Sequence, residues 1–295
     1  MQMLEIKGKI SFADRIAAFL GSYPLKINFP NQNYALIGRG SVSILRRIVF
    51  HGGVKHDYPL LECGNYCEAS ECQILVDGEH SNDKIVNITL SSFPLLRNIL
   101  KKNNNDTYKC HAKSTIKIGN NVTLSSHAII LSGAVIGNGA VIGANAIVAS
   151  TIPEYEIAVG IPARGGRKRV SKQQIDIANE LRWWDFEPSF LTLHIDKLFD
   201  LESNYDFFKT NAIYADDTKK VVIDFIPQAD KELQIRVSGV EIDGKFTTLD
   251  ESPEFIKNYF RQMSLPESQT LTWVPNIFFT YEKGEVLKKG CQSPP

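Results

Sequence analysis

The sequence lacks the features that mark a membrane-spanning, secreted or nucleic-acid-binding chain. Its 33 Lys and Arg balance 33 Asp and Glu, so the composition gives no general attraction to nucleic acid or to an anionic membrane. No apolar run approaches the roughly 20 residues of a membrane span. The N-terminal stretch MQMLEIKGKISFADR mixes charges with short apolar pieces and contains no signal-peptide core. These absences predict a cytoplasmic protein without a membrane span or a nucleic-acid partner.

Cysteine is also sparse, with five in 295 residues, and three of them lie in the stretch LLECGNYCEASECQIL. Their spacing matches no usual zinc pattern, and a structural disulfide is not expected in a reducing compartment. In steps of six the stretch reads CGNYCE, ASECQI, LVDGEH. This register predicts that Cys63 and Cys67 point into a core as small hydrophobic residues. A metal cluster at these cysteines is the alternative.

Residues 118 to 153 contain the clearest pattern in the chain. Six at a time they read IGNNVT, LSSHAI, ILSGAV, IGNGAV, IGANAI, VASTIP. The first place of each block is aliphatic, at Ile118, Leu124, Ile130, Ile136, Ile142 and Val148. The fifth place is small or β-branched, at Val122, Ala128, Ala134, Ala140, Ala146 and Ile152.

A repeat of six residues is typical of a parallel β-helix. Each block forms one short strand on one side of a three-sided prism, so that three blocks close a coil and the aliphatic row stacks along the axis. Gly and Asn fall at the corners, where a positive φ costs them little. An ordinary Gly-rich region of strands and turns is the alternative to this prism.

The sequence resembles the hexapeptide-repeat acyltransferases, and within them the xenobiotic acetyltransferase branch and its sugar-modifying relatives. The resemblance covers about residues 34 to 190. It depends on the repeats together with GEH at 78–80, SSFP at 91–94, GIPAR at 160–164 and RWWDF at 182–186. It implies a left-handed parallel β-helix, a homotrimer and the use of acyl-CoA.

The predicted fold is mainly β, a left-handed parallel β-helix with C-terminal helices and a small α+β appendage. Four regions follow along the chain: an N-terminal segment at 1–33, the β-helix at 34–170 with an extruded loop at 81–115, capping helices at 171–202, and an α+β region at 203–295. The prism has an open end at its last coil, which needs a cover. We expect a helix that begins after Ser171 to provide it.

In the C-terminal region, three stretches read as strands, at 219–227, 232–249 and 271–287. Asp243 and Gly244 are typical of a hairpin turn, and Ser252 is typical of a helix N-cap. The resemblance does not extend to this region, so its role stays open.

Acyl transfer from a thioester needs a base for the acceptor proton, and an imidazole suits this role because its pKa lies near working pH. The chain has six histidines, and none stands out by residue pattern alone. The resemblance assigns the general base to the His of the GEH motif, which is His80. His127, at a repeat corner, is the second candidate. Asn82 and Asp83 are candidates for the acceptor side.

The phosphates of CoA attract Arg and Lys, and its pantetheine arm binds backbone amides. The run Arg164, Arg167, Lys168 and Arg169 follows the last coil. The resemblance places Arg164 and Arg167 at the nucleotide end of CoA, and Ser126 and Ala144 beside the pantetheine. Two departures weaken the match. Relatives commonly have V-W-I-G where this chain has 122–125 as VTLS, and Thr-Lys where it has 149–150 as AS.

The leading hypothesis is therefore an acetyl-CoA-dependent O-acetyltransferase without a metal, acting on a hydroxyl of a sugar or of a surface-polysaccharide precursor. An antibiotic acceptor, such as chloramphenicol or a streptogramin, is the alternative within the enzyme class. A non-catalytic β-helix scaffold is the alternative from another class. A zinc lyase on the same prism would need three histidines, and the candidates His80, His111 and His127 are irregularly spaced.

Overall fold

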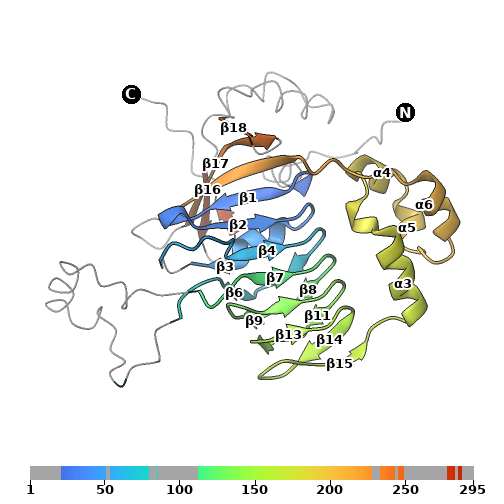
Figure 1. The fold of residues 1–295 in the computed structure, drawn as a ribbon, viewed down its shortest axis with the longest axis horizontal. Coiled ribbons are helices and arrows are strands. Elements are labelled where there is room, and N and C mark those ends of the chain that lie inside the picture. Colours follow the sequence, from blue (N-terminus) through green and yellow to red (C-terminus); the bar gives the residue numbers. More distant parts are fainter. Residues whose placement is uncertain are drawn as a thin grey trace, which may run out of the picture.

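The computed structural model describes residues 21–50, 54–79, 85, 112–227, 233–242, 245–248, 278–282 and 285–287. Within these ranges the chain winds into a three-sided β-prism, flanked by helices and extended by further strands at one end (Figure 1). No helix in this part of the chain has the length and apolar character needed to cross a bilayer.

Each side of the prism is a ladder of mostly parallel strands, and successive coils add one strand to each ladder. The first face contains β2 (Tyr34–Ile37), β4 (Leu61–Cys63), β7 (Ile116–Ile118), β10 (Val135–Ile136) and β13 (Thr151–Ile152). The second face contains β5 (Glu68–Ala69), β8 (Thr123–Leu124), β11 (Val141–Ile142), β14 (Glu156–Val159) and the antiparallel β15 (Arg164–Lys168). The third face contains β3 (Ile48–Val49), β6 (Gln73–Leu75), β9 (Ile129–Ile130) and β12 (Ile147–Val148).

The core of the prism is the stacked set of first-place and fifth-place residues. All twelve, from Ile118 to Ile152, are 3% exposed or less. Residues 18 apart pair on one face, as Ile136 does with Ile118 and Ile142 with Leu124. In the last coil the step shortens, and Ile136 pairs with Ile152, 16 residues later. The predicted period of six and three blocks per coil are therefore confirmed, and the hydrophobic effect of this axial row supplies the main stabilisation of the fold.

The corners correct one part of the sequence interpretation. Positive φ occurs at the fourth place of the blocks, at Asn121, His127, Gly133, Gly139 and Asn145. The second-place glycines have a different role, because a Cβ at Gly119 would lie 2.6 Å from the amide nitrogen of Asn138 in the next coil. The fourth place thus needs left-handed backbone, whereas the second place needs room for close approach.

The second coil contains the three clustered cysteines and a shorter corner than predicted. Cys63, Cys67 and Cys72 are buried and carry free thiols, which confirms the predicted core positions of Cys63 and Cys67. Burial raises the pKa of Cys72 to about 11. The register after Ala69 was wrong by one residue: Ile74, not Leu75, stacks on Ile130. The step from Ala69 to Ile74 is five residues, whereas the matching step from Leu124 to Ile130 in the next coil is six.

The predicted extruded loop interrupts the chain without interrupting the prism. Ile116, after the loop, pairs directly with Leu61 on the first face. The interruption therefore lies between β6 and β7, as expected from the loss of the six-residue phase. The first coil, predicted from 34–50, is confirmed by β2 and β3, with a 3-10 helix η2 (Val42–Arg47) in place of a strand on the second face.

Beyond the prism, Ser171 caps α3 (Lys172–Leu181) through a capping box with Gln174, and α3 buries Ile175, Ala178 and Leu181 as predicted. The expectation that it covers the open end was wrong, because α3 runs along the corner between the first and second faces (Figure 1). Tyr155 at that corner packs in one buried cluster with Ile175 and Ala178 of α3 and with Trp184, which follows α3. Further short helices follow: η5 (Trp183–Asp185), α4 (Pro188–Leu193), α5 (Ile195–Leu198) and α6 (Tyr205–Asn211).

The C-terminal strands continue the first face of the prism. β1 (Leu25–Asn28) pairs antiparallel with β2 and parallel with β16 (Lys219–Pro227). β17 (Leu233–Ile242), β18 (Lys245–Thr248), β19 (Phe278–Glu282) and β20 (Glu285–Leu287) follow. Ile242 pairs with Lys245, as the predicted hairpin at 243–244 requires. The predicted helix after Ser252 lies outside the described residues.

The axial row and the outer surface of one strand should respond differently to truncation. We expect Ile136→Ala to lower the free energy of unfolding by about 3 kcal/mol, because it leaves a cavity in the buried row. The matched control is Val135→Ala on the same strand, where the side chain is 37% exposed and the expected loss is under ~1 kcal/mol. Denaturant unfolding followed by circular dichroism measures both. Equal losses would contradict the assignment of the axial core.

Candidate active site at a prism corner

Two predicted pantetheine contacts, Ser126 and Ala144, lie one above the other in adjacent coils. They occupy the corner between the second and third faces, after β8 and β11. The carbonyl of Ser126 accepts the N–H of Asn145 at 3.1 Å. Ala144 is exposed and Ser126 is half-buried. The structure therefore brings these two residues together at a corner with accessible backbone, which is the surface that an extended amide-containing ligand requires.

His127 lies beside this corner on left-handed backbone, with φ of 62°. Its N–H donates to the carbonyl of Glu71 in the preceding coil, and its side chain is exposed. Non-Gly residues are uncommon in this conformation, although His is among those enriched there. An exposed imidazole thus stands next to the predicted ligand surface.

The basic run after the last coil divides into two pairs with different environments. Lys168 lies 3.7 Å from the carboxylate of Glu156, and Arg169 donates to the carbonyl of Gly139 at 2.6 Å. Arg164 and Arg167 make no ion pair with a carboxylate in the described part of the chain. These two guanidiniums are the ones predicted to meet CoA, and they are the ones left available for an anion.

The positions of these two arginines follow from the β14–β15 hairpin. Arg164 lies opposite Val159, whose side chain packs against Gly143 beside Ala144. Arg164 is therefore close to the corner of Ser126 and Ala144. Arg167 lies opposite Ile157, farther along the second face.

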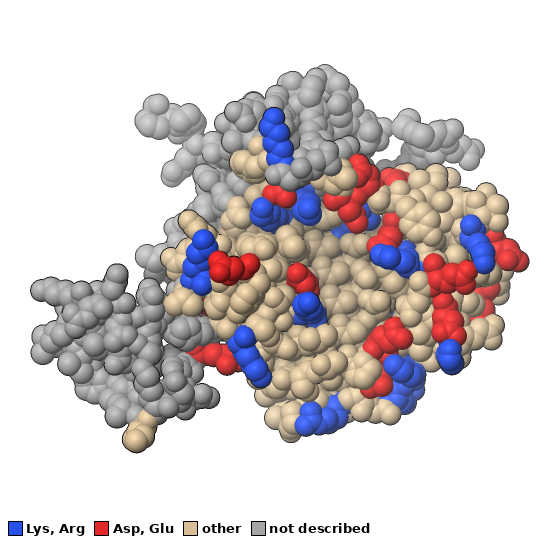
Figure 2. Space-filling view, viewed as in Figure 1, with Lys and Arg blue, Asp and Glu red and all other residues tan. Residues whose placement is uncertain are grey.

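Arg164 also explains a departure noted in the sequence. Its Nη1 lies 3.4 Å from the hydroxyl of Ser150, within the pair 149–150 where relatives commonly have Thr-Lys. A guanidinium therefore reaches the place from which a lysine is missing. Sequence reasoning did not detect this, because residues 150 and 164 meet only after the hairpin folds back. On the face in Figure 2, Lys and Arg are interspersed with Asp and Glu and form no broad basic patch.

The predicted base His80 and the acceptor-side residues Asn82 and Asp83 lie outside the described residues, as do His51 and His111. The residues just before them are described, and Gly78 has φ of 106°. Among the described residues, no three His, Cys, Asp or Glu side chains are grouped to hold a metal ion.

Comparison with known proteins identifies the repeat. Residues 115–150 match the family described as bacterial transferase hexapeptide (six repeats). The chain therefore carries the hexapeptide repeat of this transferase family, which confirms the resemblance that the repeats indicated. No curated protein matches the sequence.

Several solved structures are similar over part of the chain. A galactoside acetyltransferase in complex with coenzyme A is 25% identical, with 50% of this chain and 62% of that chain covered and a TM-score of 0.31. A maltose O-acetyltransferase from Clostridium difficile 630 is 23% identical, with 57% and 80% covered and a TM-score of 0.34. A hexapeptide-repeat-containing acetyltransferase from Vibrio cholerae O1 biovar eltor, complexed with acetyl coenzyme A, is 19% identical, with 57% and 82% covered and a TM-score of 0.33. With TM-scores this low, these similarities do not establish the activity of this chain.

Proposed function

We propose that this protein is a CoA-dependent acyltransferase that transfers an acetyl group to a hydroxyl. The observation that carries the proposal is the match of residues 115–150 to a transferase hexapeptide family on a prism whose corner exposes Ala144 beside Arg164. Its other support is the resemblance of the GEH, GIPAR and RWWDF motifs to the xenobiotic acetyltransferase branch.

The described residues fit an acyl-CoA. The corner at Ser126 and Ala144 offers backbone polar groups and little side-chain bulk, which suits the amides of a pantetheine arm. Arg164 and Arg167 supply guanidiniums without a described carboxylate partner, which suits the phosphates of the nucleotide. Bound there, acyl-CoA supplies the activated thioester, and the chain supplies its orientation and a base.

In this proposal His80 acts as the general base. Its imidazole takes the proton of the acceptor hydroxyl while the hydroxyl oxygen forms a bond to the thioester carbonyl carbon. The carbon–sulfur bond then breaks, and the proton passes to the leaving thiolate, so the products are the ester and free CoA. A main-chain N–H would hold the oxyanion that develops between these steps.

For the acceptor we favour a sugar or a precursor of a surface polysaccharide. The support is the long region that follows Trp183 and Trp184. It continues the first face of the prism through β16 and β17. A small-drug modifier has no need of such an extension. The alternative is an antibiotic O-acetyltransferase of the chloramphenicol or streptogramin type. The alternative outside the enzyme class is a scaffold that binds no CoA.

Replacement of the proposed base should abolish most turnover. We expect His80→Ala to lower kcat by about 100-fold or more, because general base catalysis typically contributes that much. The assay measures free thiol released from acetyl-CoA with a panel of sugars and with chloramphenicol. The matched control is His127→Ala, the exposed corner histidine, which should stay within about threefold of the wild type.

The outcomes separate the hypotheses. Turnover with sugars only supports the carbohydrate acceptor, and turnover with chloramphenicol only supports the alternative. If His80→Ala retains full activity while His127→Ala loses it, the assignment of the base is wrong. Titration calorimetry with CoA that gives no heat would favour the scaffold.

The guanidiniums of Arg164 and Arg167, which pair with no described carboxylate, should control the affinity for CoA. We expect Arg164→Ala and Arg167→Ala each to weaken CoA binding about tenfold, because a charge-assisted hydrogen bond is worth about 1.5 kcal/mol or more. The matched control is Lys172→Ala, an exposed cation that pairs with Asp176 on α3 at 2.8 Å. Calorimetry measures the three dissociation constants. If Arg164→Ala and Arg167→Ala weaken CoA binding no more than Lys172→Ala does, neither arginine contacts CoA.

We also propose that the protein is a homotrimer packed through the third face. The support is the outward row of that face, in which Ile129 pairs with Ile147 and Leu131 follows. These side chains stay partly exposed in one chain. In the same two coils the outward row of the first face carries Lys117 and Val135.

A charge placed in the third face should therefore separate the subunits. We expect Ile129→Glu to yield monomers, because an unpaired carboxylate cannot be buried cheaply in an interface. The matched control is Val135→Glu on the outward side of the first face, which should leave the oligomer intact. Light scattering coupled to size exclusion measures the mass. A wild-type monomer, or trimers of both variants, would contradict the proposed interface.

A further inference from the structure

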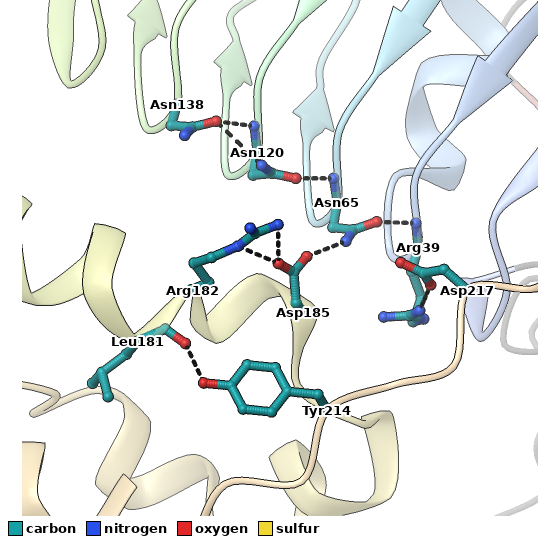
Figure 3. A network of polar contacts seen from close by, with 9 residues as sticks. All are labelled: Arg39, Asn65, Asn120, Asn138, Leu181, Arg182, Asp185, Tyr214 and Asp217. Carbon is teal, nitrogen blue, oxygen red and sulfur yellow. Dashed lines mark hydrogen bonds and ion pairs between the residues drawn. The ribbon is translucent and has the colours of Figure 1, made fainter. Parts of the chain in front are cut away.

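The corner between the first and second faces carries a ladder of side chains that ends in an arginine (Figure 3). Asn138, Asn120 and Asn65 occupy the same place in successive coils. Each side-chain oxygen accepts the backbone N–H of the next ladder residue toward the N-terminus, at 2.8 Å for Asn120, 2.7 Å for Asn65 and 2.7 Å for Arg39. Arg39 thus stands in the first coil where three other coils have Asn.

The guanidinium of Arg39 interacts with Tyr66 of the next coil and with a carboxylate from outside the prism. Arg39 is 1% exposed, and its Nη2 donates to the carboxylate of Asp217, whose side chain is 52% exposed. Within the described part of the chain Nη1 is buried and has no hydrogen-bond partner, and Asp217 is the only carboxylate there that pairs with this guanidinium. Burial raises the pKa of Asp217, and the Arg39 charge opposes that rise.

Asp217 belongs to residues 182–218, which we call the return segment. It carries the chain back from the last coil to the first, where β16 joins β1 (Figure 1). Its two ends run side by side: the N–H of Glu187 donates to the carbonyl of Ile213 at 2.7 Å, and the N–H of Ala215 to that of Asp185 at 2.9 Å. Tyr214 also donates its hydroxyl to the carbonyl of Leu181 at 3.0 Å.

Two carboxylates of the return segment connect it to adjacent coils (Figure 3). Asp185 accepts from the side-chain amide of Asn65 at 3.1 Å and pairs with Arg182 at 2.7 Å. Asp217 pairs with Arg39 in the neighbouring coil. Four residues further along, the N–H of Val221 donates to the carbonyl of Pro24 at 2.9 Å, which begins the pairing of β16 with β1. The ion pair therefore lies immediately before the point where the C-terminal strands enter the sheet.

We propose that Arg39 and Asp217 form a clasp that fastens the return segment to the first coil and thereby keeps the C-terminal strands docked on the prism. The prism itself does not depend on the clasp, because its axial row and corner ladder are complete without the guanidinium. Opening the clasp would release β16 and β17 together from β1, since β17 pairs with β16 and not with the prism.

Hydrogen exchange on the full-length protein tests the clasp. We expect Asp217→Ala to raise amide exchange in 212–227 by about tenfold or more, because it leaves a buried guanidinium without its counter-charge. Exchange in β7, β8, β9 and β10–β12 should stay at wild-type rates. The matched control is Asp196→Asn, an exposed carboxylate on α5, which should change neither region.

A second variant distinguishes loss of the ion pair from general destabilisation of the prism. Arg39→Asn gives the first coil the residue that three other coils carry at this place, so the prism should fold, while the ion pair is lost. It should also raise exchange in 212–227 and spare β7–β12. Wild-type exchange in 212–227 for both variants would overturn the proposal, and so would an equal rise throughout the prism.

Discussion

The close stacking of coils at one corner is the constraint on which the rest of this structure depends. Neighbouring strands lie about 4.8 Å apart, and the chain must turn at that corner without side chains between the coils. A Cβ at Gly38, Gly64 or Gly137 would lie 2.4 to 2.7 Å from backbone atoms of the following coil. Glycine at these positions is therefore a packing requirement, and the axial row can form only because the corners close.

The same constraint decides which side chains are available for chemistry. The side chains of first-place and fifth-place residues are buried in the core, so we expect functional side chains at the corners. The third place beside the close-packed glycines holds the Asn ladder and Arg39, and it is directed toward the return segment. The corner between the second and third faces holds Ser126 and Ala144, and Arg164 approaches it from the final hairpin. One corner thus serves assembly of the chain, and the other is the one we propose for the ligand.

The four cations after the last coil show the same division between side chains used by the fold and side chains left for a ligand. Two of the four cations after the last coil are satisfied within the fold: Lys168 pairs with Glu156, and Arg169 binds the carbonyl of Gly139. The run therefore looks like one basic patch in the sequence. In the fold, two of its cations bind other parts of the protein, and the other two, Arg164 and Arg167, pair with no described carboxylate. Burial is costly for an unpaired charge, which is why Arg39, the one deeply buried arginine among the described residues, has a carboxylate brought to it from 178 positions away.

The sequence by itself determined the prism, its core and the repeat family, because a six-residue period records which side chains face the axis regardless of what surrounds the coil. It also determined the capping box at Ser171. The tertiary structure decided the one-residue slip after Ala69, the meeting of Arg164 with Ser150, the course of α3 along the prism, and the union of β1 with β16. Each of these depends on distant segments packing against one another, and local propensity and periodicity contain no information about such partners.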